Sequence, residues 1–179
     1  MKPERIFHPK DTPELLGGWL LHAHKERDRH DEAARRYENR RFTLGSIAIA
    51  LSAIVGTSVF GSLATKSADA RVAVAVGLVS VAATVLTALS TFFDYAGRAT
   101  RHRKAAAACK GIIREIEEAI SNLESGVAID PAWVKAIRQR FDLIASDTPV
   151  VLPDVYRTIQ EKYTAIKFIE EAKDLYPMG

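Results

Sequence analysis

Two long stretches of the chain are apolar at nearly every position, whereas polar residues dominate the segments on either side. Residues 42–65 and 72–93 contain no Asp, Glu, Lys or Arg, and only residues 66–71 separate them. Each stretch is long enough to span a membrane, since about 20 mostly apolar residues cross the ~30 Å hydrocarbon core as an α-helix. Buried core helices of a soluble protein are the alternative, but the other segments are too polar to cover them. The pattern therefore predicts a transmembrane hairpin over residues 42–93.

Helical spacing also marks the segments that flank this hairpin. Residues 1–41 predict an N-terminal helix, and residues 94–179 predict a helical region that begins as a continuation of the second apolar helix. Gly126 is typical of a helix end, Asp130 followed by proline is typical of a capped helix start, and a last helix is expected after Asp154. The apolar faces of these three helices are Ile112, Ile113, Ile116, Ile120 and Leu123; Trp133, Ile137, Phe141 and Ile144; and Val155, Ile159, Tyr163, Ile166 and Ile169. No stretch alternates like a strand, so the predicted fold class is all-α.

Basic residues near the ends of the two apolar stretches predict the orientation of the hairpin. They are Arg27, Arg29, Arg35, Arg36, Arg40 and Arg41 before it, Arg98, Arg101, Arg103 and Lys104 after it, and only Lys66 and Arg71 in the loop. This asymmetry places both termini in the cytoplasm and leaves a loop too short for a receptor domain outside. A signal is therefore expected from the cytoplasm. The formal net charge of +3 is too small to indicate a nucleic-acid partner.

A line of hydroxyl side chains runs along the second apolar segment. Its members are four or three residues apart and share one face of a helix. They are Ser80, Thr84, Thr87 and Thr91, followed by Asp94 and Arg98. We call these six residues the polar stripe. Small and polar residues often line contacts between membrane helices, so packing is one interpretation. The other is that several copies turn the stripe toward a shared axis, forming a wetted pore with Asp94 near its inner mouth.

The first apolar segment carries a matching ridge of small residues. Its members are Ser46, Ala50, Ala53, Thr57, Gly61 and Ala64. Such a ridge allows helix backbones to approach closely, and its partner is either the second helix or a neighbouring subunit. Stripe and ridge together are more than a lone hairpin can bury. This favours a homo-oligomer.

Cationic side chains gather on the cytoplasmic side of the predicted hairpin. This collar consists of Arg35, Arg36, Arg40, Arg41, Arg98, Arg101, Arg103 and Lys104. Its simplest role is to set the topology and to contact anionic lipid headgroups. The alternative is an anionic ligand, for instance a nucleotide, held by arginine. The residue pattern is compatible with both.

The sequence contains no catalytic constellation. His22 and His24 are two residues apart and point to different faces of a helix. Together with His30, they are expected on a solvated polar face and not in a metal site. The single cysteine, Cys109, implies no disulfide framework. We therefore expect no enzyme, no metal and no cofactor.

The order of these parts resembles the SLATT family of bacterial two-helix membrane proteins. The resemblance spans residues 15–170 and is carried by FTLGSIAIALSAIVG, by VLTALSTFFDYAGRATRHRKAAAACKGIIREIEEAI and by the proline-flanked DTPVVLPDVYRTIQEKY. Members of this family are regarded as effectors encoded beside nucleotide second-messenger synthases and other antiphage genes. The resemblance implies a protein that assembles in the inner membrane and breaches it when infection is sensed. Because no sensing domain is evident, it also implies a separate cytoplasmic sensor protein or a nucleotide second messenger.

Two functions follow as hypotheses. The first is an oligomeric membrane effector in antiviral, abortive-infection-type defence that forms a pore or disrupts the bilayer. The second is a non-conducting, membrane-anchored scaffold whose Trp133, Phe141 or Tyr163 face docks a cytoplasmic partner.

Overall fold

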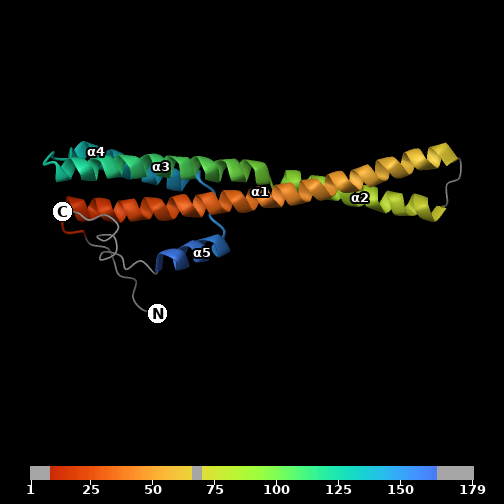
Figure 1. Ribbon diagram of the computed structural model, residues 1–179, viewed down its shortest axis with the longest axis horizontal. Helices are drawn as coiled ribbons and strands as arrows, with labels where there is room; N and C mark the ends of the chain where they lie inside the picture. Colours follow the sequence, from red (N-terminus) through yellow and green to blue (C-terminus); the bar gives the residue numbers. More distant parts are fainter. Residues whose placement is uncertain (1–8, 66–69, 165–179) are drawn as a thin grey trace. The chain divides into compact units, whose positions relative to one another are not determined.

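The described part of the chain consists of helices joined by short connections. The computed structural model describes residues 9–65 and 70–164 of the 179-residue chain. Its helices are α1 (Thr12–Thr65), α2 (Ala70–Phe92), α3 (Tyr95–Glu124), α4 (Pro131–Asp147) and α5 (Pro153–Thr164) (Figure 1). No strand occurs in these two ranges, and the predicted all-α fold class is confirmed. Most of the predicted loop, and Ile166 and Ile169 of the last apolar face, lie outside the described residues.

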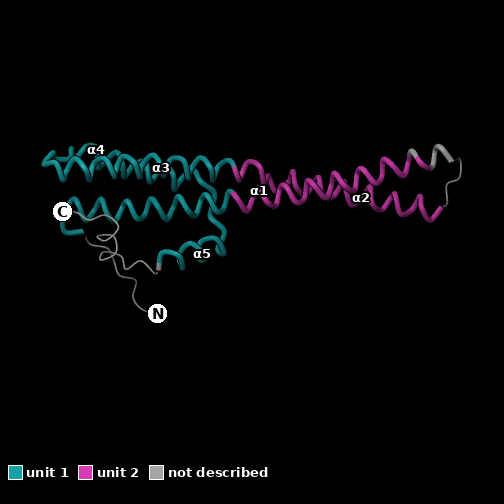
Figure 2. Tube along the Cα trace, viewed as in Figure 1, with its two compact units in different colours: residues 1–34, 100–179 teal, residues 35–99 magenta. Residues whose placement is uncertain are grey.

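The chain divides into two compact units (Figure 2). Unit 1 comprises residues 1–34 and 100–179, and unit 2 comprises residues 35–99. The helix α1 contributes residues to both and has no interruption near residue 41, where the N-terminal helix was expected to meet the hairpin.

The core of unit 1 is built by three helices. Its buried side chains are Leu16, Leu20 and Ala23 of α1, Ile112, Ile113, Ile116 and Ala119 of α3, and Ile137 of α4. The half-buried Ile120, Leu123, Trp133, Phe141 and Ile144 pack against them. The two apolar faces predicted on α3 and α4 are therefore confirmed. Edge-to-face packing of Trp19 on Phe141, with ring centroids 6.2 Å apart, joins α1 to α4.

The connection between α3 and α4 has the chemistry predicted for it. The helix α3 ends at Glu124, and Gly126 adopts a φ of 80°, a left-handed conformation that glycine adopts at no steric cost. Asp130 then caps α4, because its carboxylate accepts a hydrogen bond of 2.8 Å from the backbone N–H of Ala132. Pro131 occupies the first turn, where its missing N–H costs nothing.

The short helix α5 is held on α1 by a small apolar cluster and by polar contacts. Val155 and Ile159 pack with Ala33. The ring of Tyr156 lies 4.0 Å from the guanidinium carbon of Arg29. Further along α5, the side chains of Lys162 and Tyr163 both donate hydrogen bonds to Asp28 of α1. We call the contacts of Asp28 with these two residues the α5 latch.

Asp28 titrates as expected for a carboxylate at the centre of such a latch. Burial alone raises the pKa of Asp28, but hydrogen bonds from Lys162, Arg27 and Tyr163 outweigh burial and lower that pKa. Burial and the same carboxylate raise the pKa of the Tyr163 hydroxyl to about 12. At neutral pH the latch therefore joins a charged carboxylate to an intact hydroxyl donor.

In unit 2, α1 and α2 lie side by side through residues at helical spacing (Figure 2). Ala48 and Ala83 are buried, and the half-buried positions recur three and four residues away along each helix. We call this set the hairpin seam: Leu44, Ala48, Leu51, Val55 and Ser58 of α1, with Val76, Val79, Ala83, Leu86 and Ser90 of α2. The alternating steps are those of two helices in coiled-coil-like contact.

Most other side chains of the hairpin are apolar and exposed. In the most apolar stretch of α1 no residue is buried, and in that of the second helix only 6% of the residues are buried. Both helices are long and apolar enough to cross a membrane. Such exposure is typical of helices that face a membrane or other subunits and not of core helices in a soluble protein, because core helices are covered by the rest of their chain.

One expectation about helix continuity is wrong. The second apolar helix was expected to run unbroken to Glu124, but α2 ends at Phe92 and α3 begins at Tyr95. Between them Asp94 adopts a φ of 45°, in the left-handed region that Asp tolerates better than most residues. A chain with this conformation cannot continue a right-handed helix without a break.

Candidate functional site

The hydroxyls of the polar stripe bond to their own helix. Each donates to the carbonyl four residues earlier: Ser80 to Val76 at 2.9 Å, Thr84 to Ser80 at 2.9 Å, Thr87 to Ala83 at 3.0 Å and Thr91 to Thr87 at 3.1 Å. A hydroxyl has one proton and two acceptor lone pairs. With its proton directed at the backbone, each oxygen presents acceptors outward, which suits water and cations.

The stripe lies beside the hairpin seam and not in it. At about 100° per residue, Ser80 to Thr91 are centred about 90° around α2 from the seam. Ser80, at the edge, is half-buried, whereas Thr84, Thr87 and Thr91 are exposed. The hairpin of one chain therefore leaves these three threonines uncovered.

The small-residue ridge lies almost opposite the seam on α1. Its centre is about 140° around the helix from the seam. Five of its members are exposed: Ser46, Ala50, Ala53, Thr57 and Gly61. The side chain of the sixth, Ala64, lies outside the described part. Of the two partners considered for the ridge, α2 of the same chain does not cover it.

The break between α2 and α3 divides the polar stripe. Asp94 lies in the break, and its carboxylate accepts a hydrogen bond of 3.0 Å from the backbone N–H of Gly97. Arg98 lies on α3, with its guanidinium carbon 5.9 Å from the centroid of the Tyr37 ring. Asp94 and Arg98 are exposed, but the six residues do not follow one uninterrupted helix.

Gly97 is required by this arrangement. A Cβ at position 97 would lie 2.2 Å from Oδ2 and 2.5 Å from Oδ1 of Asp94. No side chain fits at that distance, so any other residue at position 97 displaces the carboxylate. The capped break therefore depends on two residues, Asp94 and Gly97.

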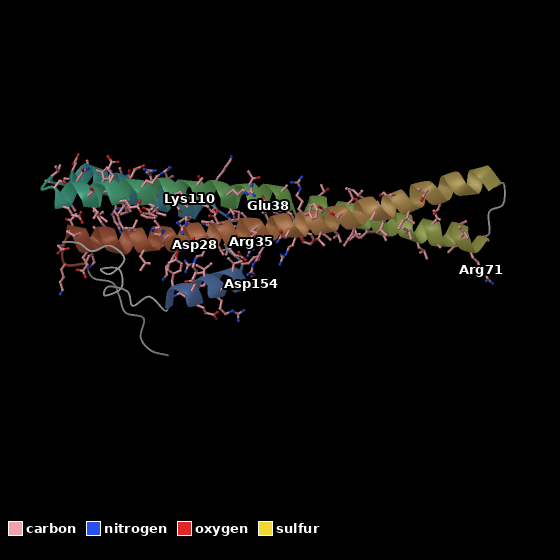
Figure 3. The ribbon with its side chains drawn as sticks, viewed as in Figure 1. Asp28, Arg35, Glu38, Arg71, Lys110 and Asp154 are labelled. Carbon is pink, nitrogen blue, oxygen red and sulfur yellow. The ribbon has the colours of Figure 1, made fainter. Side chains whose placement is uncertain are left out.

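Exposed cations occur at the ends of the hairpin helices. The collar side chains on α1 and α3 are exposed except for Arg36, which is half-buried. In unit 2, Arg35 lies at one end of the hairpin and Arg71 at the other (Figure 3). Aromatic rings accompany the collar, since Tyr95 lies 6.2 Å from Tyr37 and 5.6 Å from Phe93 by ring centroids.

One histidine lies where the sequence did not indicate. His30 is buried, and its Nδ1 lies 3.0 Å from Nδ1 of the buried His102 on α3. The expectation of a solvated polar face is therefore wrong for His30, while His22 is exposed and His24 half-buried. One ring must donate and the other accept in this hydrogen bond.

The environment of His30 favours its neutral form. Burial lowers the pKa of His30; Glu26 opposes this shift and Arg29 adds to it. Burial also raises the pKa of the Cys109 thiol to about 11, so little thiolate forms at neutral pH. In the part of the chain that the structure describes, no group of three or more His, Cys, Asp or Glu side chains is placed to hold a metal ion.

The aromatic residues considered as docking faces contact other parts of unit 1. Trp133 and Phe141 are half-buried against the core. The Tyr163 hydroxyl donates to Asp28 at 2.9 Å. Within unit 1 these three side chains therefore stabilise the packing of α4 and α5.

Comparison with known proteins gives one result. Residues 18–174 match the sequence profile of the SMODS and SLOG-associating 2TM effector domain family 4, a SLATT family. No curated protein and no solved structure matches the chain significantly. The match covers most of the chain and agrees with the two exposed apolar helices of unit 2. The chain belongs to this SLATT family, and it is a two-helix membrane effector associated with SMODS and SLOG signalling.

Proposed function

We propose that the protein is a membrane-permeabilising effector whose assembled hairpins form a pore. The observation that carries this proposal is the row of exposed hydroxyls on α2, which the seam of its own hairpin leaves uncovered. In the hydrocarbon core, exposed polar groups are unfavourable unless they meet protein or water. Several copies facing one another satisfy this requirement.

The chemistry of the stripe favours the passage of cations and water. Thr84, Thr87 and Thr91 each direct a proton to the backbone and present lone pairs outward. Repeated around an axis, they form rings of acceptor oxygens, and Asp94 and Arg98 lie at the inner mouth, where their opposite charges offset each other. The exposed ridge on α1 supplies a surface through which neighbouring copies approach closely. The protein then acts as a homo-oligomer in the lipid bilayer.

The proposal includes an orientation and a location. The excess of Arg and Lys on the collar side, against Lys66 and Arg71 at the loop, supports cytoplasmic termini in the bacterial inner membrane. The collar then contacts anionic headgroups. No catalytic step, metal or cofactor is assigned to the chain.

The family supports a role that depends on a cytoplasmic signal. Its name pairs the effector domain with SMODS and SLOG partners. We propose that a separate sensor protein or a nucleotide second messenger triggers opening, and that loss of the ion gradients halts an infected cell in antiviral defence. Unit 1 is the cytoplasmic part that receives the signal.

Substitutions in the stripe test the pore lining. Thr84→Leu with Thr87→Leu replaces two exposed hydroxyls by apolar groups and is expected to abolish K⁺ flux from liposomes while membrane insertion persists. The matched control is Val81→Leu with Val85→Leu, which adds the same residue at two exposed positions elsewhere on α2. Equal flux in the two variants would exclude the stripe as the lining.

An exchange of the hairpin separates this function from that of a scaffold. Residues 42–93 are replaced by an unrelated two-helix anchor, and depolarisation of the cells that express the protein is measured. A pore loses its activity, whereas a scaffold that only needs a tether keeps it. The packing of Trp133 and Phe141 within unit 1 favours the pore, because these side chains are engaged inside the chain.

A further inference from the structure

The side of α2 and α3 that packs on α1 shifts around the helix axis at Asp94. Along α2 the seam advances by three or four residues to Ser90, but the next inward residue is Tyr95, five residues later. Five residues of unbroken α-helix turn through about 500°, which leaves Tyr95 about 140° away from the direction of Ser90. In the structure, however, Tyr95 lies 6.2 Å from Tyr37 by ring centroids, and Ala99 is buried. The break at Asp94 makes this inward packing compatible with the seam.

The polar stripe has the opposite requirement. From Thr91 the next members are Asp94 and Arg98, three and seven residues later, which continue the same face only if the helix is unbroken. Because Tyr95 packs on Tyr37 of α1 after the break, Arg98, three residues further along α3, no longer continues the line of the threonines. One short segment thus carries two residue patterns that a single backbone conformation cannot satisfy together.

We propose that residues 94–97 form a two-state hinge. In the broken state, Tyr95 and Ala99 pack on α1 and the polar stripe is interrupted. In the continuous state, α2 and α3 join and bring Asp94 and Arg98 into line with Thr84, Thr87 and Thr91. The role in conduction rests on the proposed function: the broken state is closed and the continuous state conducts.

Two residues hold the broken state. The Asp94 carboxylate accepts the N–H of Gly97 at 3.0 Å, and Asp94 tolerates its φ of 45°. The helical ladder resumes at once, since Phe93 N–H bonds to Leu89 O and Arg98 N–H to Asp94 O, each at 3.0 Å. The rearrangement is therefore confined to a few backbone torsions.

Gly97→Ala selects the continuous state. Its Cβ would lie 2.2 Å from Asp94 Oδ2, so the carboxylate must leave its cap, and Ala also favours helix over Gly. The matched control is Gly77→Ala on α2, where a Cβ meets nothing within 4 Å. Asp94→Asn tolerates positive φ and keeps a side-chain oxygen that accepts the Gly97 N–H, so it is expected to retain the broken state.

A disulfide reports the hinge without reference to flux. Tyr37→Cys and Tyr95→Cys are introduced with Cys109→Ala into the full chain, in liposomes of bacterial lipids. We expect the cross-link to form at least tenfold more slowly with Gly97→Ala than with Gly77→Ala. Equal rates would overturn the hinge. Asp94→Asn should cross-link at the rate of the Gly77→Ala control.

A distance measurement covers the case in which loss of the tyrosines unfolds the chain. Spin labels at Val81→Cys and Ala107→Cys, again with Cys109→Ala, are 26 residues apart, which is about 39 Å along one straight helix. Gly97→Ala is expected to give a distribution centred on this straight-helix distance, and Gly77→Ala a distribution that is not centred there. The same distribution in both would also overturn the hinge.

A third measurement tests the coupling of the hinge to conduction. In liposomes that contain the native tyrosines, Gly97→Ala should release K⁺ at least tenfold faster than Gly77→Ala. If the cross-link and the distance change but the K⁺ release does not, the hinge stands and its assigned role as the gate is overturned. If these measurements contradict the hinge, the substitutions in the polar stripe still test the proposed pore separately.

Discussion

The α5 latch offers a quantitative test of how the cytoplasmic helices are held. Asp28 on α1 accepts hydrogen bonds from Lys162 Nζ at 2.6 Å and from the Tyr163 hydroxyl at 2.9 Å, both on α5. The Asp28 side chain is only 13% exposed. Asp28→Ala removes both contacts and leaves the apolar cluster around Val155 intact.

The expected cost follows from the exposure of the partners. A hydrogen bond to a charged group contributes about 1.5 kcal/mol, which applies to Tyr163. The Lys162 side chain is 62% exposed, so solvent screening limits its ion pair to about 0.5 kcal/mol. Asp28→Ala should therefore weaken the docking of α5 by about 2 kcal/mol, or about 30-fold in the opening equilibrium.

Amide hydrogen exchange in α5 measures this opening directly. The backbone N–H groups of α5 after Pro153 should exchange about 30-fold faster in Asp28→Ala, while those of α4 change little. The matched control is Asp31→Ala, three residues along α1, whose ion pair with Lys110 joins side chains that are 45% and 52% exposed. That pair should contribute less than about 0.5 kcal/mol. Equal acceleration in the two variants would refute the latch.

Further predictions concern stability. Burial lowers the pKa of His30, so below pH 6.5 the unfolded chain binds more protons than the folded chain. The contribution of neutral His30 to stability is therefore complete above pH 6.5 and is lost as the pH falls. Thermal unfolding should begin at a lower temperature at pH 5.5 than at pH 7.5, and an unchanged midpoint would contradict this. Ile137→Ala empties a core position that is 1% exposed and should destabilise unit 1 by about 2–5 kcal/mol in denaturant unfolding, whereas Leu143→Ala, 60% exposed, should cost far less. Asp130→Ala removes the cap of α4 and should cost about 1 kcal/mol, with Asp130→Asn nearly neutral by the same assay.

Features that depend on local spacing were predictable from the sequence. The two charge-free stretches predicted the membrane helices, and the recurrence of Ile112, Ile116 and Ile120 predicted the face that α3 buries. Asp130 with Pro131 predicted the start of α4. In each case the residues that carry the information are neighbours on one helix, so periodicity is sufficient.

Features that depend on pairing between helices were not predictable in this way. Assigning His30 to a solvated face considered only α1, whereas its partner, His102, lies on α3 among small buried residues such as Ala99 and Ala106. The break at Asp94 was missed because DYAG has no proline. The five-residue step from Ser90 to Tyr95 is the pattern that marks it, and it becomes visible only once the seam on α1 is known.

The most direct test of the central claim is leakage from liposomes that contain the purified protein. The release of K⁺ and of a small trapped dye is followed beside that of the Thr84→Leu, Thr87→Leu variant. The account predicts that the native protein, without its trigger, releases K⁺ slowly through the small fraction of open pores and that the variant releases none, with dye release added if the pore is wide. Native protein and variant that release K⁺ at the same rate would contradict it.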